Sequence, residues 1–177
     1  MKEINMRINP ELNICIVKTN TTTGEKTWHY GKNIVTNDGD LYYAQQAVEA
    51  TPTSDFGGSN GRMELRTGSA TPAKGDVFTQ VTTPIPTSIQ PMDSNYPKVN
   101  DGDSDNTGSG TDIVTWRTSW TTSDFNSNAI IGGCFHLGGS GSPGNSTKLL
   151  THFSITSFNK TASDTLKIFV NHTFNGV

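Results

Sequence analysis

The sequence predicts a mainly β protein: an antiparallel β-sandwich or a jelly-roll-like, partly closed barrel, with one short helix near residues 39–49. The first observation is that apolar and polar residues alternate in several short segments, as they do where successive side chains point to opposite faces of a sheet. The second is that Gly and Pro separate these segments. The third is a composition of 32% hydrophobic and 16% charged residues, which is typical of a chain rich in turns and strands.

The length of 177 residues fits one domain, and we expect a single β-rich domain over residues 1–177. Two parts of this domain differ from the rest in composition. One is a proline-rich arm at about residues 83–98, and the other is an acidic loop at about residues 100–112.

The first half of the chain begins with a predicted hairpin. Residues 12–19 alternate, a turn follows at residues 22–25, and residues 26–30 form the returning strand. The helix comes next, with Asn37 or Asp38 as the N-cap that accepts hydrogen bonds from the first turn. The residues at helical spacing are Leu41, Ala44, Ala47 and Val48.

The middle of the chain is dominated by Gly and Pro. Residues 51–61 predict a loop, residues 62–67 a short strand with Met63 and Leu65 on one face, and residues 68–76 another connection. The prolines of residues 83–95 exclude a helix and suit an edge strand or an extended arm able to wrap a neighbouring molecule.

The second half predicts four strands, at residues 113–121, 129–137, 148–158 and 165–174. Gly132 and Gly133 indicate a bulge or a close backbone approach in the second of these strands, and residues 138–147 form a flexible turn. In the last strand one row faces the core and a mostly polar row faces outward. The core row contains Leu166, Ile168, Val170 and Phe174, and the outer row contains Lys167, Asn171 and Thr173.

The net charge of −3 disfavours binding to nucleic acid, which requires clustered Lys and Arg. The chain has no run of eighteen apolar residues, and residues 1–10 lack the hydrophobic core of a signal peptide. We therefore expect a soluble protein that is made in the cytosol and does not bind membranes.

The sharpest local pattern is acidic. Asp101, Asp103, Asp105 and Asp112 occupy positions 1, 3, 5 and 12 of a twelve-residue calcium loop. Position 6, where such loops need Gly for a sharp turn, is Asn106, and a strand follows in place of a helix. The sequence leaves open whether this loop binds Ca²⁺ or is a solvated acidic loop.

No arrangement of residues predicts an enzyme, a metal centre or a cofactor site. Cys15 and Cys134 are interpreted as small buried hydrophobes, and whether they form a disulfide stays open. His172 falls in the apolar row of the last strand, where a hydrogen-bonded, partly buried imidazole is expected. No metal-ligand spacing connects the four histidines, which are His29, His136, His152 and His172.

The aromatic residues have two interpretations. Trp28, Trp116 and Trp120 could line a carbohydrate-binding face if they were exposed. Their alternation with polar residues favours the protein core for most of them.

Three segments carry a further pattern in their order along the chain. The first is Gly-Lys-Asn-Ile-Val-Thr-Asn-Asp-Gly at residues 31–39, ahead of a helix. The second, residues 65–76, is a short strand followed by Thr-Gly, small residues, Pro and an acidic residue. The third, residues 158–168, reads as a closing hairpin in which Lys-Thr precedes a last alternating strand. In this order the three segments resemble a diffuse family of tailed-bacteriophage virion proteins.

The resemblance implies a non-enzymatic building block of the virion, made in the cytoplasm of a host bacterium. The function it predicts is a capsid decoration or cement protein, possibly trimeric, that binds the major capsid protein or other virion proteins. The alternatives are a tail, baseplate or fibre-associated component and, from a different class, a carbohydrate-binding module. We expect residues 83–98 to make the contact, because an arm stiffened by proline loses little entropy on docking.

Overall fold

The computed structural model describes residues 13–48, 51, 55–57, 60–68, 71–78, 83–108, 110–137 and 148–174. These residues form one antiparallel sheet with the strand order β4-β3-β7-β8-β2-β1-β9-β6-β5. The strands are β1 (Ile14–Asn20), β2 (Lys26–Val35), β3 (Gly61–Arg66), β4 (Gln90–Pro91), β5 (Lys98–Val99), β6 (Ile113–Trp120), β7 (Ser127–Leu137), β8 (Leu149–Lys160) and β9 (Asp164–Thr173).

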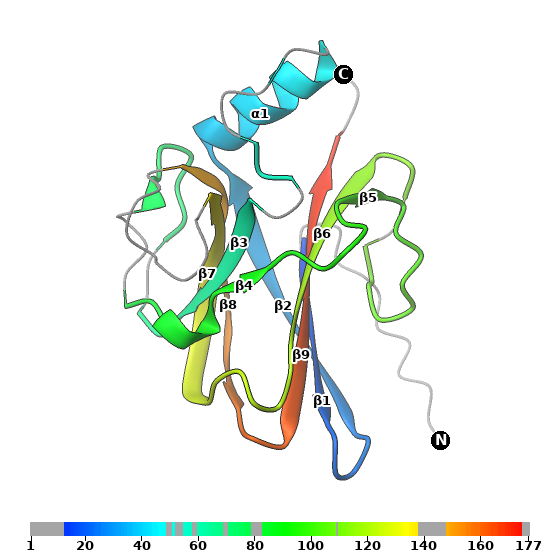
Figure 1. Cartoon of the computed structure of the whole chain (residues 1–177), viewed down its shortest axis with the longest axis vertical. Coiled ribbons are helices and arrows are strands. Elements are labelled where there is room, and N and C mark those ends of the chain that lie inside the picture. The colour runs from blue at the N-terminus through cyan, green and yellow to red at the C-terminus, as the bar shows by residue number, and fades with distance from the viewer. Residues whose placement is uncertain are drawn as a thin grey trace.

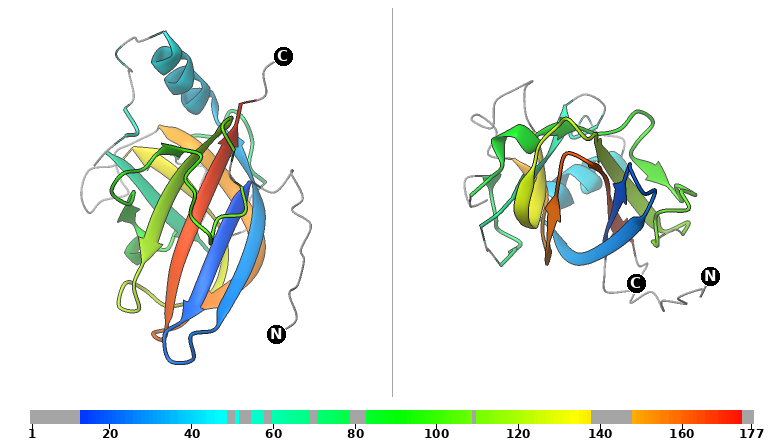
Figure 2. Two further views of the ribbon diagram at one scale, coloured as in Figure 1. Left: turned by 90° about the vertical axis from the view of Figure 1, so that its right-hand side faces the viewer. Right: turned by 90° about the horizontal axis from the view of Figure 1, so that it is seen from below.

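The sheet curls into a partly closed barrel, and the helix α1 (Asn37–Ala47) lies at one end of it (Figure 1). Seen from the opposite end, the strands curve around a common interior (Figure 2). The predicted mainly β fold with a partly closed barrel is therefore confirmed, and so is the single helix near the expected position.

The proline-rich arm closes the open side of the barrel. It contributes both edge strands, because β4 pairs with β3 and β5 pairs with β6. Between them, Met92 and Tyr96 are buried at 7% and 6% exposure. The arm includes η2 (Pro86–Ser88), a short 3₁₀ turn. The expected role as an edge is confirmed, and the arm is packed on its own domain. Its contact with a neighbouring molecule stays a prediction.

The interior of the barrel is the main core. Along β9 the inner row predicted from the alternation is confirmed for Leu166, Ile168 and Val170, each at most 1% exposed. It fails at Phe174, which follows the end of β9 and is 46% exposed. Other strands supply the rest of the interior, including Ile14, Ile16, Met63, Leu65, Trp116, Trp120, Phe135 and Phe153.

The outer face of β9 differs from the prediction. Phe169 and Asn171 are only 0% and 3% exposed, although both lie on the face opposite to the barrel core. The acidic loop covers this face, and its Asn106 contacts Asn171 directly. Alternation in one strand can reveal two faces, but it cannot show that a distant loop covers the polar one.

The helix begins at Asn37, two residues earlier than the sequence suggested. Thr36, and not Asn37 or Asp38, is the N-cap, and its Oγ1 accepts a hydrogen bond from the Gly39 backbone N–H at 3.3 Å. The buried residues of α1 are Gly39 and Tyr42, while Leu41 is 47% exposed. Among the described residues, no helix has the length and hydropathy that crossing a bilayer requires.

Several glycines lie at turns and bulges where a larger residue would be strained or would collide with its neighbours. In the β1–β2 hairpin, Gly24 has φ +73°, a conformation that favours glycine. In β7 the pairing with β8 shifts between Ile130 and Gly132, and a side chain on Gly132 or Gly133 would collide with Phe153. The predicted bulge and close approach are both confirmed. The turn predicted at residues 138–147 lies outside the described residues.

Candidate functional site

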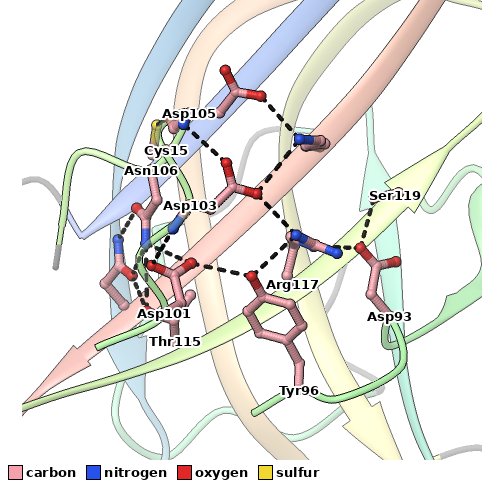
Figure 3. A network of polar contacts seen from close by, with 12 residues as sticks. Cys15, Asp93, Tyr96, Asp101, Asp103, Asp105, Asn106, Thr115, Arg117 and Ser119 are labelled. Atoms are coloured by element: carbon pink, nitrogen blue, oxygen red, sulfur yellow. Dashed lines mark hydrogen bonds and ion pairs between the residues drawn. The ribbon is translucent and has the colours of Figure 1, made fainter. Parts of the chain in front are cut away.

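The acidic loop lies across the outer face of β1, β9 and β6, where it meets basic side chains from the sheet (Figure 3). Lys26 Nζ and Lys167 Nζ donate to the two carboxylate oxygens of Asp105, at 2.7 and 2.9 Å. Arg117 Nη1 donates to Asp103 Oδ2 at 2.9 Å. The loop is thus attached to the sheet by ion pairs between its carboxylates and three cations.

Arg117 also joins the loop to the proline-rich arm. Its Nε donates to Asp93 Oδ2 at 2.5 Å, and its guanidinium lies over the Tyr96 ring, 4.3 Å from the ring centroid. Ser119 Oγ donates to the same Asp93 oxygen at 2.7 Å. Arg117 of β6 therefore holds both the acidic loop and the proline-rich arm in position.

Electrostatics in the network favour the charged forms. Burial opposes ionisation of Asp105, but hydrogen bonds from Lys26 and Lys167 outweigh it and lower the pKa of this carboxyl. Burial alone would likewise lower the pKa of Lys167, whereas its hydrogen bond to Asp105 and the nearby Asp103 charge raise it.

A buried amide cluster completes the attachment. Asn106 Nδ2 donates to Asn171 Oδ1 at 3.0 Å, and Asn171 Nδ2 donates back to Asn106 Oδ1 at 2.9 Å. Thr115 Oγ1 donates to Asn171 Oδ1 at 2.8 Å. Both amides are less than 9% exposed, so their reciprocal bonds replace lost hydration. Asn106 at the sixth loop position therefore has a structural partner, which the calcium-loop pattern did not anticipate.

The four candidate calcium ligands do not form one group. Asp103 and Asp105 pair with the cations of the sheet, and Asp101 Oδ2 accepts from Tyr96 Oη at 3.2 Å. Asp112 accepts the Phe174 backbone N–H through its own carbonyl at 2.8 Å. Within the described ranges, no three His, Cys, Asp or Glu residues are placed so that they could hold a metal ion. The geometry favours the acidic-loop interpretation.

The two cysteines are free thiols, and different parts of the chain cover them. Cys15 Sγ is 3.5 Å from the Asp105 carbonyl, under the acidic loop. Cys134 lies on β7 with 0% exposure, and Phe78 packs against its cluster. Both are buried hydrophobes as expected, without a disulfide between them. Burial raises the pKa of each thiol.

The structure places His29 on β2 and His172 on β9, in different surroundings. His172 is 3% exposed and its Nδ1 lies 2.6 Å from Tyr43 Oη, which confirms the hydrogen-bonded imidazole. Burial lowers its pKa to about 3. His29 stacks on Phe158 with ring centroids 4.4 Å apart.

A second polar cluster was not predicted from the sequence. Glu64 of β3, Cys134 of β7 and His152 of β8 are directly opposite one another on the outer face of the sheet. His136 lies two residues along β7, with Nε2 3.7 Å from Glu64 Oε2. The acidic and imidazole side chains are at most 1% exposed. The register of three strands brings them together, and no local motif carries that information.

The tryptophans belong mainly to the core, as the alternation favoured. Trp116 and Trp120 are 0% and 1% exposed. Their indole N–H groups donate at 2.7 Å, to Tyr43 Oη and the Ser88 carbonyl respectively. Trp28 remains 38% exposed. The burial of two of the three rings removes the platform on which the carbohydrate-binding alternative depended.

Exposed apolar residues concentrate at the α1 end of the barrel. Leu41 and Val48 are 47% and 74% exposed, and Phe174, 46% exposed, packs edge-on against Tyr43 of the same helix. We call Leu41, Val48 and Phe174 the apolar end. Val99, 60% exposed, lies on β5, which is separated from β9 by β6.

Comparison of the chain with protein-family models, with curated proteins and with solved structures found no match.

Proposed function

We propose that the chain is a non-enzymatic structural protein of a tailed-bacteriophage particle, a decoration or cement protein that binds the major capsid lattice. The observation that carries the proposal is the ordered resemblance of residues 31–39, 65–76 and 158–168 to virion proteins. The alternative within the same particle is a tail, baseplate or fibre-associated component. Assembly as a homo-oligomer, with a trimer as the candidate state, belongs to the same proposal.

The three segments have defined structural roles in this fold. The first two meet at the start of α1, where the Asn37 N–H donates to the Lys74 carbonyl at 2.9 Å and Lys74 pairs with Asp40 at 2.5 Å. In the third, the backbone N–H and Oγ1 of Thr161 both donate to Asp164 Oδ2 at 2.8 Å and form the β8–β9 turn. The resembling residues therefore make specific contacts that shape this fold, beyond sharing a composition.

The apolar end is the surface that we assign to capsid binding. The proline-rich arm is engaged with its own barrel, whereas Leu41 of α1 and Val48, the residue that caps its C-terminus, expose apolar side chains. Covering apolar surface is favourable at roughly 25 cal/mol per Å², and clustered exposed apolar residues are typical of protein interaction sites. A capsid protein with an apolar surface is the partner that fits this face.

The test is binding of the purified protein to particles that lack it. The double variant Leu41→Ser/Val48→Ser should lose roughly tenfold or more in affinity, because two apolar side chains no longer become buried. Trp28→Ser is the control, since it removes an exposed apolar side chain near the end of β2 that lies farthest from α1. Cosedimentation with particles measures the affinity, and circular dichroism verifies that each variant is folded. Equal binding by the double variant and wild type would exclude this surface, and no binding by wild type would refute the proposed function.

A further inference from the structure

The buried cluster on the outer face of β3, β7 and β8 contains polar atoms that lack partners. Neither carboxylate oxygen of Glu64 has a hydrogen-bond partner among the described residues, and the same holds for Nε2 of His136. Glu64 is 0% exposed and His136 is 1% exposed. A buried polar group without a partner is costly, most of all when it is charged.

The hydrogen bonds of His136 determine where its proton lies. Its Nδ1 is 3.0 Å from the Leu137 carbonyl, and a carbonyl can only accept, so Nδ1 carries the hydrogen. In the neutral imidazole, Nε2 therefore carries a lone pair and no hydrogen. This nitrogen lies 3.7 Å from Glu64 Oε2. An ionised Glu64 would place a negative oxygen opposite that lone pair. One additional proton, on either atom, converts two opposed acceptors into a donor and an acceptor.

A defined segment covers this pair. We call residues 71–78 the covering segment. Its Phe78 ring lies over His136, with ring centroids 4.4 Å apart, and its Asp76 Oδ2 lies 2.7 Å from His152 Nδ1. Phe78 also packs against the cluster of Cys134 and Leu149. The cover keeps water away from the carboxyl and imidazole groups, so the charge state of the pair affects the stability of the cover.

We infer that Glu64 and His136 form a proton-binding site beneath the covering segment, and that loss of the proton weakens the cover. The desolvated Glu64 carboxyl agrees with this, since burial raises its pKa to about 7, while burial lowers the pKa of His136. The other titratable or charged groups around the pair are Arg62 and Arg66 of β3, Cys134 of β7, His152 of β8 and Asp76 of the covering segment.

The sign of the pH dependence follows from the raised pKa. Between the unfolded value near 4.5 and the folded value of about 7, the folded state binds more protons at Glu64. The stability contributed by Glu64 is therefore complete at acidic pH and is lost as pH rises through about 7. The lowered pKa of His136 acts in the opposite direction, so the test must isolate Glu64.

Glu64→Gln isolates it, because glutamine keeps the size, cannot ionise, and offers an N–H donor to the His136 lone pair. The variant should melt at nearly the same temperature as wild type at about pH 4, below the unfolded pKa near 4.5, and roughly 5 °C or more above it at about pH 8.5. A difference in melting temperature that stays constant across this pH range would overturn the proton-binding site, since it would reflect packing alone.

Thiol labelling tests the coupling to the cover. In a Cys15→Ser background, Cys134 lies beneath the covering segment and reports its opening. At about pH 8.5 Glu64→Gln should label several-fold more slowly than Glu64 protein, and the difference between the two rates should shrink as the pH falls toward about 4.5. In a Cys134→Ser background, Cys15 under the acidic loop is the control and should label equally in both. Equal Cys134 rates at the higher pH would refute the coupling.

Discussion

Thr36 connects the helix to the sheet through one hydroxyl. Its Oγ1 accepts from the Gly39 N–H at 3.3 Å and donates to the Leu149 carbonyl of β8. Its backbone N–H donates to the Leu150 carbonyl at 3.1 Å. The residue is fully buried, so these bonds replace hydration that is lost on folding. One side chain therefore both caps α1 and fixes its position at the end of the barrel.

Thr36→Ala should lower the free energy of unfolding by about 2 kcal/mol, because it removes the cap and leaves a buried carbonyl with one partner fewer. Thr36→Ser is the matched control, since it retains the hydroxyl and should lose less than about 1 kcal/mol. Urea denaturation monitored by tryptophan fluorescence measures both variants. Similar losses in the two variants would show that the hydroxyl does not stabilise the helix start.

The sequence predicted this helix start only approximately. Asn37 and Asp38 are good caps, and so is Thr36, so composition alone does not select among three adjacent candidates. The Thr36 hydroxyl also donates its hydrogen to the Leu149 carbonyl of β8, and this tertiary contact favours Thr36 as the N-cap. Glu64 and His136 were missed for a related reason, because their proximity depends on the register between β3 and β7.

At the scale of elements, ion pairs hold the acidic loop on the sheet. Asp105 interacts with two lysines whose side chains are 42% and 39% exposed, while its own side chain is 10% exposed. Solvent screening reduces the strength of such partly exposed pairs. The lowered pKa of Asp105 makes its contribution present above about pH 3.8, the ordinary value, and lost as pH falls through the folded pKa.

Asp105→Asn should destabilise the protein by about 1 kcal/mol at neutral pH, where it removes both lysine ion pairs. The loss should shrink as pH falls below about 4, because wild type then loses the same interaction. Asp112→Asn is the matched control, with the same charge change on an exposed residue of the same loop. Urea denaturation across this pH range measures both. A pH-independent loss for Asp105→Asn would contradict the ion-pair explanation.

The positions of the strands could be predicted from the sequence. The way in which the acidic loop, the proline-rich arm and residues 71–78 pack on the sheet could not. Alternation located β1, β6 and β9 because those strands have one apolar face toward the interior. The proline-rich arm gave a correct edge signal, since proline cannot complete a ladder of hydrogen bonds. Its partners on β3 and β6 are distant in sequence, so nothing local showed that it would close its own barrel.

At the scale of the whole molecule, different segments of the chain cover different surfaces of the barrel. The acidic loop covers the outside of β1, β9 and β6, and the covering segment lies over β7 and β8. The arm spans the open side between β3 and β6 (Figure 1). The apolar end remains exposed beside α1. The proline-rich arm, which the sequence suggested for adhesion, thus makes intramolecular contacts. The proposal therefore assigns capsid binding to the apolar end.

The position of the protein on intact phage particles tests the central proposal most directly. Gold-labelled antibody against the protein, viewed by electron microscopy on purified particles, reports whether it is present and where. A decoration protein should label the capsid surface at many regularly spaced positions. Label confined to the tail would transfer the protein to the alternative virion role, and particles without any label would contradict a structural role in the virion.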